Sequence, residues 1–221
     1  MKYNNIITAN FISRPNRFIA HVDIDGVDTV VHVKNTGRCR ELLLPGARVY
    51  LEKAQNPERK TPYDLVAVEK DDRIINIDSQ APNIVVKEWL LSRGEYDKVQ
   101  PEYKFGNSRI DFYMEKGEQR YLMEVKGCTL FRDGVGYFPD APTERGAKHL
   151  RELTGAIAQG YNTAVAFVIQ GEGISEVRPN EDTDPEFAKA FREALNAGVK
   201  IIFFTCEIAS DELKISAQLM Q

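Results

Sequence analysis

The spacing of apolar and polar positions divides the chain into two parts, and the first part follows the two-residue period of β-strands. Short alternating runs are separated by turn signals such as Asp25-Gly26 and Pro45-Gly46. The predicted strands span residues 4–11, 17–24, 27–33, 48–53, 64–69 and 73–77. Between two of them, residues 38–44 are expected to form a single helical turn. Five or six short strands in so few residues favour a small antiparallel barrel, most economically an OB-like one, over residues 1–80.

The remaining residues, 81–221, alternate between helical and strand periods. The predicted helices span residues 81–92, 143–159 and 185–197, with Thr143 and Asp184 as starting signals and Gly198 as the last stop. The predicted strands span residues 99–105, 108–115, 120–126, 163–170 and 199–206. Residues 127–142 are expected to form a loop, and residues 211–217 either an edge strand or a tail. This half is therefore predicted to be an α/β domain around a central mixed sheet.

Composition places the protein among soluble globular chains. The 221 residues are 43% hydrophobic, but no apolar run is long enough to span a bilayer, and the first residues do not resemble a signal peptide. The three cysteines are far apart and lack metal-site spacing, which favours a reducing, cytoplasmic location. The net charge of −4 is not typical of a nucleic-acid binder, so any contacts with phosphate must come from local clusters of cations.

The stretch with the most chemical content is the predicted hairpin of residues 108–126. On its second strand Glu124 and Lys126 are two residues apart and share one face, while Met123 and Val125 take the other. Asp111 lies on the first strand, where the turn allows its carboxylate to approach Glu124. Two carboxylates and an ammonium suit Mg²⁺ or Mn²⁺ together with a water molecule to be activated. The alternative is that Glu124 and Lys126 form an ordinary surface ion pair.

Other residues could complete such a site. A third metal-binding carboxylate is expected from Glu102 on the preceding strand or, as second choice, from Glu88 on the preceding helix. His149 is interpreted as a solvated or packed histidine more than as a catalytic one. The residues predicted to contact nucleic-acid phosphates are cations and one amide, in a turn before residue 41, on the hairpin and on the following helix: Lys34, Asn35, Arg38, Arg40, Arg109, Arg145 and Lys148.

The order of elements sharpens this interpretation. Helix, three strands, helix and strand is the order of the restriction-endonuclease-like core, in which an acid on one strand precedes Glu-x-Lys or Asp-x-Lys on the next. Asp111 and Glu124-Val125-Lys126 occupy those two places. The predicted site is therefore a metal-dependent phosphodiesterase site, with Asp111, Glu124 and Lys126 as catalytic residues and Asp111, Glu124 and Glu102 as metal ligands.

Four stretches also resemble the sugar fermentation stimulation protein family: NTGRCRELLLPG (35–46), GNSRIDF (106–112), EVKGCTL (124–130) and FPDAPTERGAKHLREL (138–153). The resemblance implies an OB-fold domain joined to a nuclease-like domain. It further implies binding of DNA with little sequence preference, and a role in regulating genes of sugar (maltose) metabolism.

Three functions therefore remain open at the level of sequence. The first is a metal-dependent nuclease acting on DNA, with RNA as the alternative substrate and with an OB-like barrel that favours single strands. The second is a DNA-binding regulator without turnover. The third, a protein that binds sugars or other small molecules, has least support, because no dinucleotide or phosphate-loop motif is present. The sequence does not decide the oligomeric state.

Overall fold

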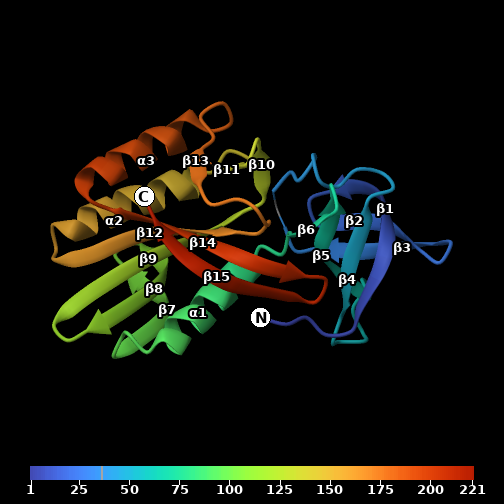
Figure 1. The fold of residues 1–221 in the computed structure, drawn as a ribbon, viewed down its shortest axis with the longest axis horizontal. Coiled ribbons are helices and arrows are strands. Elements are labelled where there is room, and N and C mark those ends of the chain that lie inside the picture. Colours follow the sequence, from blue (N-terminus) through green and yellow to red (C-terminus); the bar gives the residue numbers. More distant parts are fainter. Residues whose placement is uncertain (36) are drawn as a thin grey trace.

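The first half of the chain forms a six-stranded sheet in the computed structural model, which describes residues 1–35 and 37–221 (Figure 1). Its strands are β1 (Ile6–Asn16), β2 (Ile19–Ile24), β3 (Val27–Val33), β4 (Arg48–Lys53), β5 (Tyr63–Lys70) and β6 (Arg73–Asn76). These are the six strands that alternation predicts, with boundaries that differ by a few residues. The residues after β3 form a single turn, in which the Leu43 amide donates to the Cys39 carbonyl at 2.9 Å.

Pairing closes five of these strands into a barrel. β1 lies between β2 and β4, β4 pairs with β5, and β5 pairs in parallel with β3 through Val33 and Leu65. The inward side chains of the alternating pattern, such as Val22, Val31 and Leu51, fill the interior and are fully buried. This confirms the predicted OB-like barrel.

The second half forms another six-stranded sheet with three helices. The helices are α1 (Ala81–Arg93), α2 (Glu144–Ile157) and α3 (Pro185–Ala197). The strands of the sheet are β7 (Lys98–Phe105), β8 (Ser108–Lys116), β9 (Gln119–Cys128), β12 (Tyr161–Ile169), β14 (Lys200–Ala209) and β15 (Glu212–Met220). Both expected capping residues act as such, since the Thr143 hydroxyl accepts from the Gly146 amide and Asp184 accepts from the Phe187 amide.

The sheet is mixed, as predicted. Its order is β15-β14-β12-β9-β8-β7, with parallel pairing of β9, β12 and β14 at the centre and antiparallel pairing outside them. α1 covers one face, where Val86 packs with Val125, and α2 and α3 cover the other, where Leu150 packs with Val165 (Figure 1). The central strands are consequently apolar on both faces, as buried parallel strands are.

One region differs from the sequence-based expectation. Residues 127–142 contain β10 (Leu130–Arg132) and β11 (Val135–Phe138), which form a small sheet with β13 (Val177–Pro179). These strands are three or four residues long, and β13 pairs with β11 from a distant part of the sequence. Strands this short carry no detectable alternation, so the expected loop is wrong here. Residues 211–217, for which the sequence allows an edge strand or a tail, lie largely in the edge strand β15.

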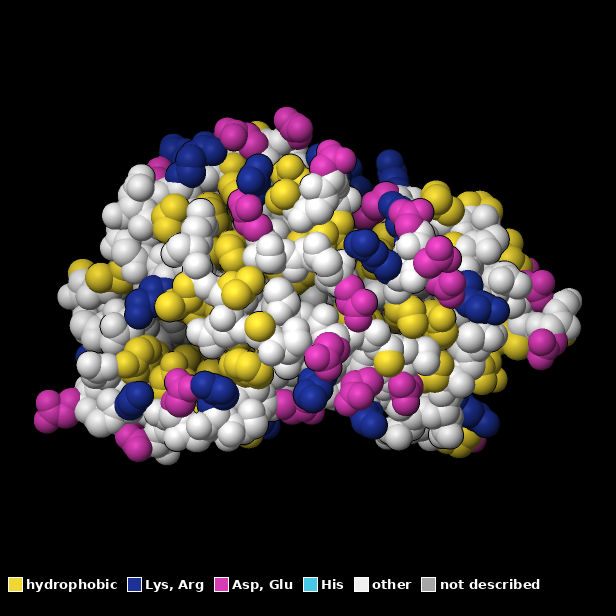
Figure 2. Space-filling view, viewed as in Figure 1, with side chains coloured by type: hydrophobic (Ala, Val, Ile, Leu, Met, Phe, Trp, Pro, Cys, Tyr) yellow, Lys and Arg dark blue, Asp and Glu magenta, His cyan; other side chains and the backbone are white. Residues whose placement is uncertain are grey.

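A polar network joins the two halves. The Gln170 amide donates to Asn76 Oδ1 at 2.8 Å, and Asn76 in turn donates to the Tyr3 hydroxyl at 2.8 Å. All three side chains are buried, so these hydrogen bonds hold the barrel against the mixed sheet. Charges of both signs are scattered over the face seen in Figure 2 and form no single patch there. Within residues 1–35 and 37–221, no helix is long and apolar enough to cross a membrane.

Candidate metal-dependent active site

The candidate site forms where β8 and β9 separate. Their pairing ends at Phe112 and Met123, so the residue before Phe112 is released from the ladder. There the Asp111 carboxylate takes the place of a backbone partner, because its Oδ2 accepts from the Val125 amide at 2.7 Å. Its Oδ1 accepts from Asn83 of α1 at 2.9 Å. Asp111 is thus fixed between α1 and the strand that carries Glu124.

Glu124 lies beside it on β9, on the face covered by α2. Lys126 Nζ donates to Glu124 Oε1 at 2.6 Å, and Nδ1 of His149, from α2, contacts the same oxygen. Met123 and Val125 pack on the opposite face with α1, which confirms the alternation expected for this strand. The second oxygen of Glu124, Oε2, is buried and has no hydrogen-bond partner among the described residues. A buried carboxylate oxygen without a partner is costly unless a ligand satisfies it.

His149 also has a defined orientation. Arg145, one turn earlier on α2, donates through Nε to His149 Nε2 at 3.3 Å. An arginine can only donate, so Nε2 accepts and the ring proton lies on Nδ1, toward Glu124. A histidine that donates to a carboxylate through Nδ1 fixes the rotamer of that carboxylate, which is a positioning role.

The pKa values of the two carboxylates are shifted in opposite directions. Burial, together with the nearby charge of Glu124, raises the pKa of Asp111 above its ordinary value. Burial acts in the same sense on Glu124, but the hydrogen bond from His149 and the ammonium of Lys126 outweigh it and hold the pKa of Glu124 below its ordinary value. Two adjacent carboxyl groups with separated pKa values are a common property of functional sites.

The three residues open into a cavity of about 520 Å³ between the two halves of the molecule, here called the site cavity. Asn35 and Ser79 line it from the barrel side, and Arg145 and Gln170 from the mixed-sheet side. Gly127 follows Lys126 in its wall, and a Cβ there would lie 2.3 Å from Gln170 Oε1, so only glycine fits. The site is therefore deep and is built by both halves.

Of the seven residues predicted to bind nucleic acid, four line a cavity or a groove and three pair with carboxylates. Arg145 and Asn35 line the site cavity, while Arg38 and Arg40 line a groove of about 670 Å³ on the barrel, here called the barrel groove. Asn35 is buried, and its amide donates to the Ile77 carbonyl at 2.8 Å. The turn expected at residues 35–37 includes Thr36, which lies outside the described residues.

The other three predicted residues are engaged by carboxylates. Lys34 lies 3.5 Å from each of three carboxylates, on Glu52, Asp64 and Asp78, with its side chain only 18% exposed. Three anions already neutralise this ammonium, which indicates a structural role, and its expected contact with phosphate stays a prediction. Arg109 pairs with Glu102 at 3.4 Å and Lys148 with Glu152 at 3.8 Å, both on the surface, and their contact with nucleic acid stays a prediction.

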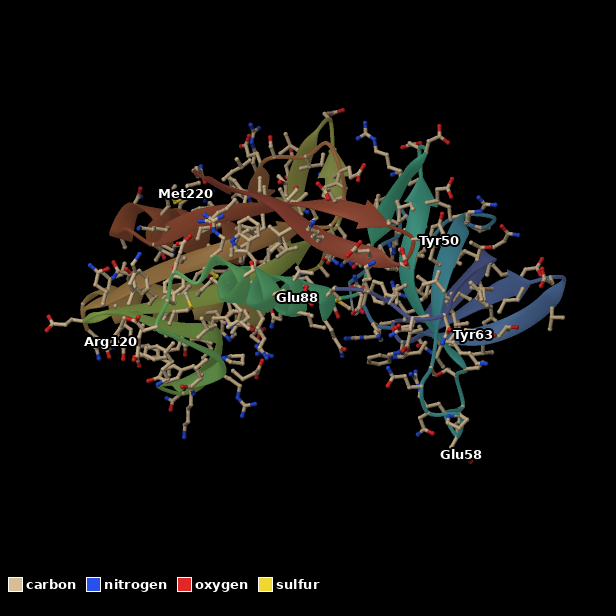
Figure 3. All side chains as sticks on the ribbon, turned by 60° about the horizontal axis from the view of Figure 1, so that its bottom comes forward. Tyr50, Glu58, Tyr63, Glu88, Arg120 and Met220 are labelled. Carbon is tan, nitrogen blue, oxygen red and sulfur yellow. The ribbon has the colours of Figure 1, made fainter. Side chains whose placement is uncertain are left out.

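The two candidates for a third metal ligand lie elsewhere. Glu102 is exposed, has a left-handed backbone conformation with a φ of 55°, and pairs with Arg109 at 3.4 Å. Glu88, labelled on α1 in Figure 3, pairs with the amino group of Met1 at 2.7 Å. Among the described residues, no group of three or more His, Cys, Asp or Glu side chains is placed to hold a metal. The expected three-carboxylate set with Glu102 is thus not assembled, and Asp111 and Glu124 remain as the candidate protein ligands.

Several residues of the site were missed from sequence. Asn83 and Asp140 carry no motif of their own, and His149 was interpreted as merely packed. The signal available for His149 was its place on the face of the helix that also carries Arg145. Asp140 accepts from the Arg38 amide at 2.8 Å and connects the barrel to the loop before α2.

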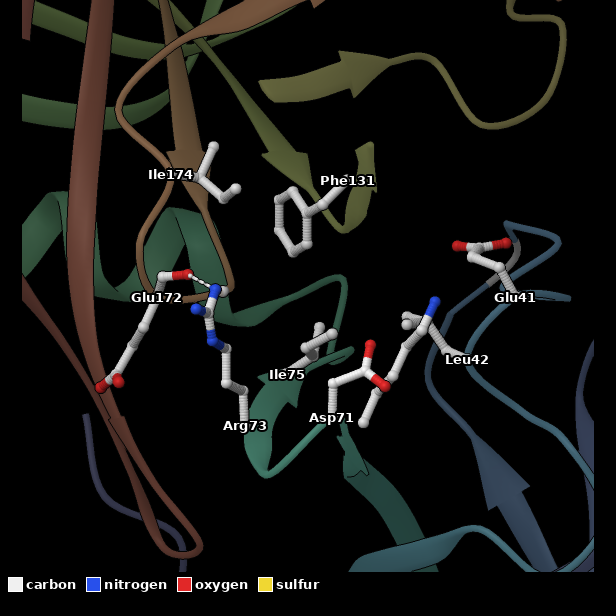
Figure 4. Close-up of a pocket in the computed structure, with 10 residues that line it drawn as sticks. Glu41, Leu42, Asp71, Arg73, Ile75, Phe131, Glu172 and Ile174 are labelled. Carbon is white, nitrogen blue, oxygen red and sulfur yellow. Dashed lines mark hydrogen bonds between the residues drawn. The ribbon is translucent and has the colours of Figure 1, made fainter. Parts of the chain in front are cut away.

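A second cavity, of about 320 Å³, also lies between the two halves but shares no lining residue with the first (Figure 4). Its wall carries both charge signs, with Glu41 and Asp71 opposite Arg73. Figure 4 shows Arg73 bonded to the Glu172 carbonyl, at 3.3 Å, so this cation is already engaged. Apolar side chains, among them Phe131 and Ile174, complete a cavity without converging ligands for a metal.

The closed barrel and the mixed sheet carrying Asp111 and Glu124-Val125-Lys126 define a protein of the class that joins an OB fold to a restriction-endonuclease-like domain. Residues 12–77 match the family model of the SfsA N-terminal OB domain, and residues 80–212 match that of the sugar fermentation stimulation protein RE domain. The chain belongs to the sugar fermentation stimulation protein (SfsA) family.

Relatives and a solved structure agree with this assignment. The chain is 51% identical over 217 residues to a sugar fermentation stimulation protein homolog of Desulfitobacterium hafniense, covering 97% of this chain and 95% of the relative. It is 50% identical over 218 residues to one from Clostridium beijerinckii, covering 97% and 96%. The structure of Pyrococcus furiosus SfsA in complex with Ca²⁺ matches with a TM-score of 0.85 at 26% identity, covering 99% of this chain and 96% of that one.

Proposed function

We propose that this protein is a DNA-binding, metal-dependent phosphodiesterase with little sequence preference, acting in the cytoplasm. In this proposal the barrel of residues 1–80 guides nucleic acid, and residues 81–221 carry the reaction. The observation that carries the proposal is the buried, unpartnered Oε2 of Glu124, next to Asp111 and Lys126 in one cavity. A buried carboxylate oxygen without a partner does not stabilise the fold and is typical of a reactive site.

The donor atoms fit a hard divalent cation. Carboxylate oxygens are the ligands that Mg²⁺ and Mn²⁺ prefer, and Asp111 retains a free lone pair on each oxygen after its two hydrogen bonds. Asp111 and Glu124 would hold the ion, and the complex of Pyrococcus furiosus SfsA with Ca²⁺ supports a divalent metal in this family. When bound, the ion supplies polarisation of a phosphate oxygen and a lowered pKa for a water molecule.

The protein's own residues then have separate tasks. Lys126, whose Nζ lies 2.6 Å from Glu124 Oε1, orients the attacking water and offsets the negative charge that develops on the phosphate. His149 holds the Glu124 carboxylate in one orientation through Nδ1, so that Oε2 stays directed away from the histidine. Arg145 lines the cavity and binds a phosphate oxygen.

A cleavage assay tests this function. End-labelled single-stranded and duplex DNA and RNA are incubated with pure protein in Mg²⁺, Mn²⁺ or EDTA, for the wild type and for Asp111→Asn, Glu124→Gln and Lys126→Met. We expect cleavage with metal only, and its loss in all three variants. The matched control is Glu115→Gln, because Glu115 also lies on β8 and pairs with a lysine, Lys98, at 3.2 Å but lines neither cavity.

The outcomes separate the two leading functions. Cleavage that persists in Asp111→Asn or Glu124→Gln contradicts the proposed site. Binding of DNA that is weakened by salt but unaffected by EDTA and by Lys126→Met, without cleavage, favours a DNA-binding regulator of sugar metabolism genes without turnover.

A further inference from the structure

The barrel groove and the site cavity are continuous. They share four lining residues, Arg17, Gly37, Ala141 and Pro142, so the end of the groove is the mouth of the cavity. The groove begins on β1 of the barrel and leads toward Asp111 and Glu124 on the mixed sheet. A chain molecule lying along the groove would therefore reach the carboxylates at its far end.

The groove carries positive charge that the protein does not neutralise. Arg17, Arg38 and Arg40 are exposed there, and among the described residues none of them has a carboxylate partner. No Asp or Glu stands among the described residues that line the groove. Because the whole chain has a net charge of −4, this local surplus is distinct from the general surface and is suited to phosphates.

A fourth arginine, Arg14, stabilises the backbone of this groove. The Arg14 guanidinium donates to the carbonyls of Gly37 at 2.9 Å, Arg38 at 3.0 Å and Arg17 at 2.8 Å. These bonds fix the backbone that presents the exposed arginines. A groove whose cations are presented by a fixed backbone loses less entropy when a ligand binds.

Unpaired bases would also find partners along this path. Phe18 follows the groove residue Arg17 in the chain and is 53% exposed, with the Arg17 guanidinium 5.8 Å from its ring centroid. Ile12 in the groove is 40% exposed, and Phe138 lines the cavity beyond it. Exposed rings and arginine planes next to a cationic groove are the elements on which single-stranded nucleic acids stack.

The burial of the site favours a flexible strand over a rigid duplex. Glu124 is only 3% exposed, and the Lys126 side chain 13%. The loop before α2 is joined to the barrel beside the mouth, where the Arg38 amide bonds to Asp140 and a Cβ on Gly37 would lie 2.3 Å from Asp140 Oδ2. A phosphate in a duplex cannot enter this space without its paired strand, whereas a flexible single strand can.

We propose that the nucleic acid acted on by this site is single-stranded, and that it enters along the arginine-lined barrel groove with its bases against Phe18 and Arg17. The part of this inference that concerns the substrate of catalysis rests on the proposed function. The strand preference itself is a property of binding and can be tested without turnover.

The test is fluorescence anisotropy in EDTA with a 5′-fluorescein-labelled oligo(dT) and a blunt DNA duplex of the same length. We expect the full-length wild-type protein to bind oligo(dT) at least about tenfold more tightly than the duplex. In Arg38→Ala/Arg40→Ala, the affinity for oligo(dT) falls about tenfold or more, and the slope of log K against log salt falls by about 1.4 for two lost phosphate contacts. Phe18→Ala lowers this affinity by about fivefold or more.

The matched control is Arg48→Ala, which removes an exposed barrel arginine that is paired with Glu69 at 3.8 Å and lies outside the groove. We expect this variant to bind like the wild type. An oligo(rU) of the same length distinguishes DNA from RNA, and tighter binding of either single strand than of the duplex supports the proposal. Equal or tighter binding of the duplex overturns it, as does an Arg38→Ala/Arg40→Ala variant that binds like Arg48→Ala.

Failure of this inference and failure of the proposed function can be distinguished. If oligo(dT) binds in the groove but is never cleaved with metal, the phosphodiesterase function fails and the strand preference stands. If duplex DNA is cleaved faster than single strands, the function stands and the inference about its substrate fails.

Discussion

Two clusters in this molecule use the same residue types for different purposes. In the barrel, Lys34 is surrounded by Glu52, Asp64 and Asp78, and in the mixed sheet Lys126 contacts Glu124 beside Asp111. Both clusters combine a largely buried lysine with carboxylates. By composition alone they could not be told apart.

Hydrogen-bond satisfaction separates them. In the barrel cluster Asp64 also accepts from Arg59 at 2.8 and 3.0 Å and contacts His32 at 2.8 Å, while Asp78 accepts from the Gln80 amide at 2.8 Å. In the site, Oε2 of Glu124 has no partner among the described residues and a cavity lies beside it. A closed and satisfied cluster holds a fold together, whereas an open and unsatisfied one is suited to a ligand.

The largest expected difference between the clusters is in cleavage. Glu124→Gln removes a proposed metal ligand and is expected to lower kcat by about a thousandfold or more. Asp64→Asn, in the barrel cluster, is expected to leave cleavage per folded molecule within about twofold of the wild type, because it lies outside both the groove and the cavity. Initial rates normalised to the folded fraction measure both. Similar losses of cleavage in the two variants would contradict the distinction between the two clusters.

The next largest difference is in stability. Lys34→Met leaves three carboxylates facing one another and is expected to lower the free energy of unfolding by about 2–4 kcal/mol, which lowers Tm by roughly 4–16 °C for a chain of this size. Lys126→Met leaves Glu124 with its His149 contact and with only one neighbouring carboxylate, Asp111, so it is expected to lower the free energy of unfolding by less than Lys34→Met does. Urea and thermal unfolding of both variants measure this, and the reverse order would be inconsistent with the assigned roles.

His149 allows the organisation of the site to be tested through metal binding. His149→Ala frees Glu124 to change its rotamer, and we expect the affinity for Mn²⁺ to fall by about 10- to 100-fold. Calorimetric titration of Mn²⁺ into the folded variant measures this without any turnover. His32→Ala, which removes the corresponding contact to Asp64 in the barrel cluster, is the control and should bind Mn²⁺ like the wild type.

The smallest expected effect is an opposite response of the two clusters to acid. Burial acts to raise the pKa of Asp64, but the bonds from Arg59 and His32 outweigh it and lower that pKa, so its stabilisation is present above the ordinary carboxyl pKa and is lost as the pH falls. The pKa of Asp111 is raised, chiefly by burial, so its contribution to stability is largest at low pH and is lost as the pH rises.

Urea unfolding at about pH 7 and about pH 3, above and below the ordinary carboxyl pKa values of about 3.9 and 4.3, measures this contrast. The destabilisation caused by Asp64→Asn should shrink on acidification, because the unfolded chain then takes up a proton that the folded Asp64 resists. The destabilisation caused by Asp111→Asn should grow. A change of the same sign in both variants would contradict the opposite shifts.

Much of the fold could be predicted because it depends on local patterns. Alternation located all six barrel strands, and the capping residues Thr143 and Asp184 located the starts of α2 and α3. The hairpin that brings Asp111 near Glu124 and Lys126 followed from the same alternation. The short strands β10, β11 and β13 could not be predicted, because pairing with distant residues defines them.

The differences between the expected and the observed contacts of the site residues also have physical causes. Lys34 carries the charge that a phosphate contact needs, but the carboxylates that neutralise it come from three separate segments and cannot be identified by spacing. Glu102 occupies the expected place on β7, but its backbone is left-handed there and its carboxylate pairs with Arg109, which the sequence pattern does not show. Arg17 and His149 gain their roles only from the junction of the two halves and from packing against β9.

The most direct test of the central claim is to locate a bound metal. Crystals soaked in Mn²⁺ and measured at its absorption edge should give an anomalous peak between Asp111 and Glu124, in contact with Glu124 Oε2, and none in crystals of Glu124→Gln. A peak among Glu52, Asp64 and Asp78 instead, or no peak near Glu124 in the wild type, would contradict the account.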